Sequence, residues 1–194
     1  MSRLDMKIGL VGEAPNDTSA IQNLLSRKYL DVDFVTLLDR IHGSMLDNKK
    51  AISRLLRIEY ESHTPDVIIF IRDLDALETD REAKRKRKEV FSASNSIVDK
   101  KGIFLLNIYE LEAIILADIN SFNNYYGTEI PGYADPMKVV MPKEVLIEAT
   151  TSLNNRFIVS HTPHLFSLLN FEIVKQNCRY FSMFIRRFEK AIGI

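Results

Sequence analysis

The stretch Val67-Ile68-Ile69-Phe70-Ile71-Arg72-Asp73-Leu74-Asp75-Ala76 decides the fold class. Its β-branched and aromatic residues predict a strand that is buried on both faces, as in the parallel sheets of α/β proteins. In an extended chain Asp73 and Asp75 would point the same way, with Cα atoms roughly 6.6 Å apart. Two negative charges at that distance repel by roughly 2.5 kcal/mol at a dielectric constant near 20. The pair therefore predicts a cation site at the carboxyl end of this strand, where open α/β sheets bind ligands.

Composition limits the class of protein. The chain has 194 residues, of which 46% are hydrophobic and 27% charged, enough for one core with a small appendage. No apolar run reaches the ~18 residues of a membrane span, and the beginning of the chain is not typical of a signal peptide. The single cysteine, Cys178, excludes an internal disulfide. We therefore expect a cytoplasmic protein without a membrane partner, and its net charge of zero requires any nucleic-acid attraction to come from a local patch.

Strands and helices alternate along the first part of the chain. Strands are predicted at 7–12, 32–38, 67–71 and 103–108, and helices at 45–62 and 109–118 among others. This alternation predicts an α/β fold, with a mostly parallel, Rossmann-like sheet of four strands flanked by helices. Residues 1–120 would form that core. Residues 121–194 would form an irregular and helical C-terminal extension packed on it.

Acidic residues follow three of the predicted strands. Glu13 follows the first, Asp73 and Asp75 the third, and Glu110 and Glu112 the fourth. A single acid at a strand end is commonly a helix cap or a solvated loop residue, but three strand ends that carry acids indicate a shared site. Carboxylate ligands favour Mg²⁺ or Mn²⁺, and a cluster this rich could hold two ions about 3.5 to 4 Å apart.

Two further features admit a structural and a functional interpretation. His42 is an exposed loop histidine or else a ligand or proton carrier. A run of five adjacent basic residues covers every side of a predicted helix. These residues face solvent or else contact phosphate groups near the carboxylates. The residues of this run, and the candidate nucleic-acid-binding residues, are Lys84, Arg85, Lys86, Arg87 and Lys88.

The end of the chain predicts an amphipathic helix. Phe181, Phe184, Ile185 and Phe188 have the spacing of one buried face. This face would dock on the sheet or form a surface for a partner. Pro142 suits the first turn of an earlier helix, and the nearby Lys143 is a possible phosphate contact.

Several motifs together resemble the toprim domain, the metal-binding fold of topoisomerases, primases and overcoming-lysogenization-defect nucleases. The resemblance is to a group of small stand-alone toprim-like proteins that are often encoded beside an ABC-type ATPase in bacterial defence loci. It covers nearly the whole chain. The matching motifs are Gly12-Glu13-Ala14-Pro15-Asn16-Asp17, Asp73-Leu74-Asp75, Glu112-Ala113-Ile114-Ile115-Leu116-Ala117-Asp118 and Cys178-Arg179-Tyr180-Phe181-Ser182-Met183-Phe184.

The resemblance implies an Mg²⁺-dependent or Mn²⁺-dependent endonuclease that acts on DNA or RNA, as an antiviral effector or toxin with an ABC-type ATPase partner. Asp73 and Asp75 would hold the metal, Glu13 would be a ligand or the general acid/base, and Glu112 a further acid. The chain departs from the family at Ala14, where glycine is usual, and at Ile114, where tryptophan is frequent. Both departures leave every carboxylate in place.

Two other functions remain open at this point. The same scaffold could be a non-catalytic subunit that docks on an ATPase or another partner, with vestigial acids. A phosphotransfer receiver domain also gathers acids at strand ends, but it requires a lysine after the fifth strand, and the sequence offers no persuasive one. A homodimer is compatible with each of these functions.

Overall fold

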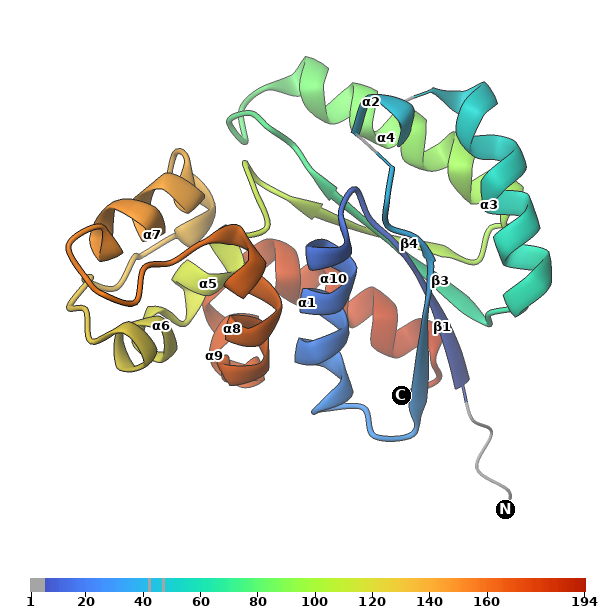
Figure 1. Cartoon of the computed structure of the whole chain (residues 1–194). Coiled ribbons are helices and arrows are strands. Elements are labelled where there is room, and N and C mark those ends of the chain that lie inside the picture. Colours follow the sequence, from blue (N-terminus) through green and yellow to red (C-terminus); the bar gives the residue numbers. More distant parts are fainter. Residues whose placement is uncertain (1–5, 42, 47) are drawn as a thin grey trace.

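The protein has an α/β fold built on one parallel sheet, as Figure 1 shows for the computed structural model of the chain. The structure describes residues 6–41, 43–46 and 48–194. The four strands lie in the order β2-β1-β3-β4, and every neighbouring pair is parallel. This confirms the predicted class of fold. The strands are β1 (Met6–Val11), β2 (Val32–Leu38), β3 (Val67–Asp73) and β4 (Gly102–Asn107).

Helices cover both faces of the sheet (Figure 1). Ile68 and Phe70 of β3 point into a cluster with α3 (Lys49–His63), and Phe91 of α4 (Arg81–Ile97) packs against it. Ile69 and Ile71 point into a second cluster, which includes α1 (Pro15–Ser26) and α10 (Arg179–Ala191). Because side chains alternate along a strand, β3 supplies both clusters and is buried on both faces, as its composition predicts.

One predicted helix is divided in the structure and another is shorter than predicted. The helix predicted at 45–62 is α2 (Gly43–Leu46) followed by α3, because the Asn48 side chain accepts hydrogen bonds from the first amides of α3 and begins a new helix. The helix predicted at 109–118 begins only at Ala113, because Tyr109 has a left-handed backbone (φ 57°) and the chain turns before α5 (Ala113–Ala117); α6 (Ile119–Tyr126) follows after Asp118. The position of His42 lies outside the described residues.

The C-terminal elements share the core of the sheet. One buried cluster extends from Ile8 and Ile69 in the strands to Phe122, Phe166 and Phe188. The predicted buried face of α10 is therefore confirmed, and α10 docks against β4. The remaining elements are η1 (Pro136–Lys138), α7 (Pro142–Thr150), η2 (Val159–His161), α8 (Thr162–Leu168) and α9 (Phe171–Asn177).

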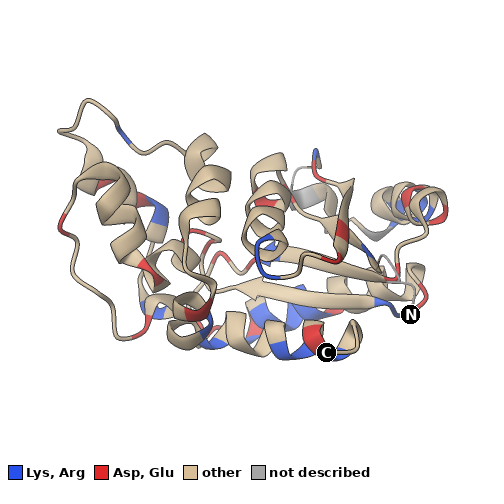
Figure 2. Ribbon diagram, turned by 90° about the horizontal axis from the view of Figure 1, so that it is seen from below, with Lys and Arg blue, Asp and Glu red and all other residues tan. Residues whose placement is uncertain are grey.

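Charged side chains of both signs are spread over the molecule, which suits its net charge of zero (Figure 2). The longest described helix, α4, carries the basic run and is strongly polar. Among the residues that the structure describes, none of the helices has the length and apolar character needed to cross a membrane.

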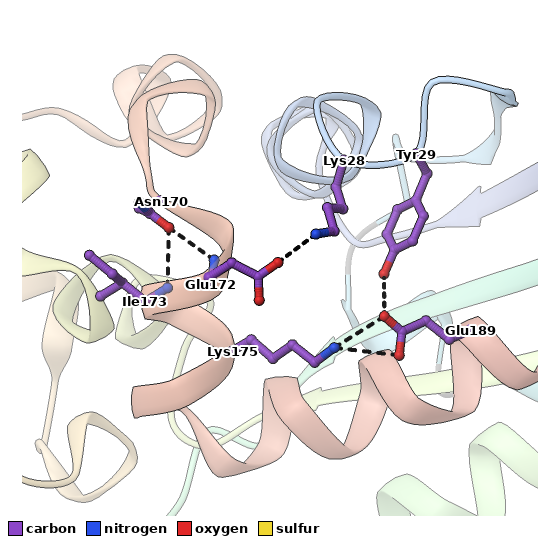
Figure 3. Close-up of polar contacts among 7 residues, drawn as sticks. All are labelled: Lys28, Tyr29, Asn170, Glu172, Ile173, Lys175 and Glu189. Atoms are coloured by element: carbon purple, nitrogen blue, oxygen red, sulfur yellow. Dashed lines mark hydrogen bonds and ion pairs between the residues drawn. The ribbon is translucent and has the colours of Figure 1, made fainter. Parts of the chain in front are cut away.

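Polar contacts orient α9 and α10 against the end of α1 (Figure 3). Lys28 Nζ lies 2.6 Å from Glu172 Oε1 of α9. The Tyr29 hydroxyl donates to Glu189 Oε1 at 3.1 Å, and Lys175 Nζ lies 3.1 Å from the same oxygen. Exposed ion pairs stabilise a protein by less than about 1 kcal/mol, so these contacts mainly fix the orientation of α9 and α10. The burial of aromatic side chains beside them contributes more to the free energy of unfolding.

Phe188 tests how much of that stability comes from α10. Its side chain is fully buried, and its ring centre lies 5.0 Å from that of Tyr29 and 6.0 Å from that of Phe184. We expect Phe188→Ala to lower the free energy of unfolding by about 3–5 kcal/mol, because it leaves a cavity between α1 and α10. Urea unfolding followed by circular dichroism measures the change. Lys190→Ala, an exposed change on the same helix, is the control, and an equal effect of both variants would contradict this account.

Candidate functional site

Acidic side chains from three loops gather at the carboxyl edge of the sheet. The loops follow β1, β3 and β4, whose ends share one edge because all strands are parallel. The negative charges of Asp17, Glu112 and Asp75 act on the carboxyl group of Asp73, and the charge of Asp75 also acts on that of Glu13. The acids predicted at strand ends therefore interact electrostatically, and Asp17 of α1 joins them.

Asp73 is the acid on which the charges of Asp17, Glu112 and Asp75 act together. It is the last residue of β3, and Asn107, its partner in β4, donates from Nδ2 to Asp73 Oδ1 at 2.9 Å. Burial raises the pKa of Asp73 well above its ordinary value, the Asn107 hydrogen bond opposes this, and Asp17, Glu112 and Asp75 raise the pKa further. A carboxyl group in such surroundings favours a proton or a bound cation.

Asp75 lies in different surroundings from Asp73. The strand ends at Asp73, and Asp75 has a left-handed backbone (φ 55°), with its amide donating to the Tyr109 carbonyl at 3.0 Å. Its side chain is 63% exposed and lies 2.7 Å from Nη2 of Arg87. The expectation that both carboxylates point the same way from an extended chain is wrong, because hydrogen bonding to the loop after β4 turns the backbone at Asp75.

Glu13 is held by an arginine from inside the sheet. Arg72 is only 6% exposed, and its Nε lies 3.1 Å from Glu13 Oε1. Burial raises the pKa of Glu13, while the charges of Arg72 and Arg87 partly lower it. Reasoning from the sequence missed Arg72, although a charged residue at the end of an otherwise apolar strand is a usable signal for a buried ion pair.

Glu112 and Glu110 occupy distinct environments after β4. Glu112 is 6% exposed and accepts a 3.4 Å hydrogen bond from the Thr162 hydroxyl. Burial raises its pKa, Lys143 lowers it in part, and the charges of Glu110 and Asp17 raise it. Glu110 instead pairs with Lys143, whose Nζ lies 2.5 Å from Glu110 Oε1. Of the two glutamates, Glu112 is thus the one that shares the surroundings of Asp73.

Asp17 is an acid of this site that the sequence indicated only as the last residue of the motif at 12–17. It does stabilise the start of α1, where the Ala14 amide donates to Asp17 Oδ2 at 3.1 Å. Burial raises the pKa of Asp17, and hydrogen bonds from the amides of Ala14 and Glu13 lower it in part. The same carboxylate raises the pKa of Asp73 and Glu112, so it belongs to the acidic edge as well as to the cap.

The basic run of α4 divides between the protein and solvent. Arg87 faces Asp75, and Lys84 donates to the Tyr180 hydroxyl at 3.0 Å. Arg85 and Lys86 are exposed and form pairs within α4, with Glu89 and Glu82 respectively. Lys88 is also exposed. Solvent exposure therefore accounts for three members of the run, and the predicted phosphate contacts stay a prediction.

The predicted metal ligands do not form a complete coordination set. In the described part of the chain, no group of three or more His, Cys, Asp or Glu side chains could hold a metal ion. Mg²⁺, however, commonly uses one or two carboxylates and takes its other ligands from substrate phosphate and water. The donor chemistry at Asp73 fits that mode, since its neighbours are acids and their mutual repulsion would fall when a cation binds.

The two departures from the toprim-like motifs are accommodated by the fold. Ala14 has φ −133° and ψ 156°, an extended conformation that any residue adopts, so glycine is not required there. Ile114 is 1% exposed and contributes to the main buried cluster.

No protein-family model, curated protein or solved structure matches the chain. The sheet order and its parallel strands show an α/β fold consistent with a Rossmann-like arrangement. The toprim-like assignment remains a prediction from the sequence motifs.

Asp73→Asn tests whether the ionised form of Asp73 destabilises the folded protein. Because the pKa of Asp73 is raised by folding, its ionised form opposes folding above the raised pKa, and this loss disappears as the pH falls toward the ordinary 3.8. We expect the variant to be more stable than the wild type at pH 8, since each pKa unit is worth about 1.4 kcal/mol, and the difference to close on acidification. Urea titrations from pH 4 to pH 8 measure it. Asp75→Asn removes only one of the charges that act on Asp73 and leaves the Asp73 carboxyl group in place, so its gain should be much smaller.

Arg72→Met tests the buried ion pair. The change keeps an unbranched side chain but leaves the Glu13 carboxylate without its guanidinium partner, and breaking a buried pair costs about 3–5 kcal/mol. We expect the free energy of unfolding to fall by about that amount at pH 7. The double variant Glu13→Gln/Arg72→Met should recover part of the loss, and a double variant that is no more stable than Arg72→Met would refute the pairing.

Proposed function

We propose that the chain is a toprim-like phosphodiester hydrolase that depends on Mg²⁺ or Mn²⁺ and cleaves nucleic acid. The observation that carries this proposal is the convergence on Asp73 of acids from three different elements, Asp17, Glu112 and Asp75, each of which raises its pKa. Like charges that lie close together at the ligand-binding edge of an α/β sheet are typical of functional sites.

The roles of the residues follow from their surroundings. Asp73 and Asp75 would hold the metal, which when bound would polarise a phosphate group. Arg72 fixes the carboxylate of Glu13 at the end of β1, where it can orient or deprotonate water. Glu112 is buried, and its raised pKa lets it hold a proton at a higher pH than an exposed glutamate does. Binding of Asp75 to the ion would require it to exchange its contact with Arg87.

The resemblance to toprim-like proteins adds the biological setting of the proposal. In that setting the nuclease is an effector of bacterial antiviral defence with an ABC-type ATPase partner. Arg85 and Lys86, two exposed cations of α4, would contact the phosphate backbone without reading sequence. These contacts would make binding of nucleic acid strongly dependent on salt.

A specific observation favours the second candidate, a non-catalytic docking subunit. Glu13 is already neutralised by Arg72, and Asp75 by Arg87. Two of the three predicted ligands thus have cationic partners in the absence of a metal ion. In this alternative the acids stabilise the loop structure, and the function lies in a protein complex.

Titration of Mn²⁺ distinguishes the two candidates. We expect the wild type to bind Mn²⁺ in isothermal calorimetry and the Asp73→Asn/Asp75→Asn variant to lose this binding, because both carboxylates are removed while the fold is kept. Circular dichroism verifies folding. Glu82→Gln, which changes an exposed acid of α4, is the matched control and should bind as the wild type does.

Substrate phosphate is included so that a negative result is decisive. The titration is repeated with an uncleavable phosphorothioate oligonucleotide, which supplies the ligands that Mg²⁺ and Mn²⁺ take from a substrate. Absence of Mn²⁺ binding by the folded wild type under both conditions would overturn the hydrolase proposal. If the double Asn variant also kept the proposed antiviral effect of the wild type in cells, this result would support the docking subunit.

A further inference from the structure

The outer edge of β4 carries main-chain groups that point away from the sheet. β4 is the last strand in the order β2-β1-β3-β4. Lys101 and Asn107 accept hydrogen bonds from the β3 side, from the amides of Ile68 and Leu74. Bonds in a parallel ladder alternate along the strand, so the main-chain groups of Phe104 and Leu106 face the opposite edge.

This edge forms the floor of a groove between α4 and α10. The groove encloses about 280 Å³, and its floor is made by Phe104 and Leu106. One wall comes from α4 and the other from α10, the helix that leads to the C-terminus and carries basic bands in Figure 2. The wall residues are Lys84, Lys88, Arg179, Tyr180, Met183, Phe184 and Arg187.

Two of the four cations on the walls have an acidic partner. Arg179 and Lys84 both approach Glu78, which also accepts a hydrogen bond from the Tyr180 hydroxyl. Lys88 and Arg187 have no acidic partner among the residues that the structure describes. They face the same groove from opposite walls. The groove therefore combines an apolar floor with two uncompensated positive charges.

We propose that the groove binds an extended acidic segment of a protein partner, which adds to β4 as a fifth strand. A peptide backbone supplies the amide and carbonyl groups that pair with Phe104 and Leu106. Successive side chains of a strand point to opposite faces, so of two adjacent acidic residues one can reach Lys88 on the α4 wall and the other Arg187 on the α10 wall, where an apolar residue can pack beside Met183. A nucleic-acid strand would satisfy the charges but cannot form a ladder with the strand edge. The proposal does not depend on metal binding or hydrolysis.

Charge reversal on the two walls tests the electrostatic part. The probe is a fluorescein-labelled seven-residue peptide in which pairs of adjacent glutamates alternate with pairs of valines, so that both faces of the strand carry acids, and its binding to the full chain is followed by fluorescence anisotropy. We expect Lys88→Glu/Arg187→Glu to weaken binding by about tenfold or more. The matched control is Arg186→Glu, at an exposed α10 residue outside the groove. It should bind the peptide with nearly the affinity of the wild type. Equal loss in both variants, or equal binding of a lysine–valine peptide, would overturn the proposal.

Methylation of the probe backbone tests strand addition without altering the protein. Two forms of the peptide carry N-methyl groups on alternate residues, one set on each edge of the strand. Strand addition predicts that one form binds about tenfold more weakly, because its amides face β4, while the other binds nearly as the parent peptide does. Equal binding of both forms, or displacement of the peptide by a single-stranded oligonucleotide of equal charge from Lys88 and Arg187, would overturn the proposal in favour of a purely ionic site.

Discussion

The carboxyl edge of this sheet must compensate carboxylates that have lost part of their hydration. Removing a charge from water costs free energy unless a partner, a proton or a cation replaces the solvent. At the end of β3 the chain meets this constraint with consecutive residues of opposite sign, Arg72 and Asp73. Arg72 turns to the face covered by α3 and α4 and neutralises Glu13. Asp73 instead meets a neutral donor, Asn107.

The pattern of compensation separates the acids into two groups. Three are matched by cations, whereas Asp73 and Glu112 have neutral hydrogen-bond donors and no ion pair within the described ranges. The charge of Glu112 raises the pKa of Asp73, and the charge of Asp17 raises the pKa of both carboxyl groups. The remaining negative charge is thus concentrated where a divalent ion or a proton would relieve it. The matched pairs are Glu13 with Arg72, Asp75 with Arg87 and Glu110 with Lys143.

Features that depend on local periodicity could be predicted from the sequence, whereas features set by contacts between residues distant in the chain could not. The apolar run of β3 and the aromatic spacing of α10 each specify burial directly, and both predictions are confirmed. Asp75 was misplaced because its left-handed backbone depends on the Tyr109 carbonyl, a contact distant in sequence. Arg72 carried a local signal, but its partner Glu13 is brought beside it only by the pairing of β1 with β3.

Helix α4 connects the acidic edge with the groove at β4. Arg87 points to Asp75, whereas Lys84 and Lys88, which are one helical turn apart, line the groove. Because α4 is one continuous helix of 17 residues, the direction in which each cation points decides which site it serves: Arg87 neutralises an acid of the carboxyl edge, while Lys84 and Lys88 supply positive charge to the groove.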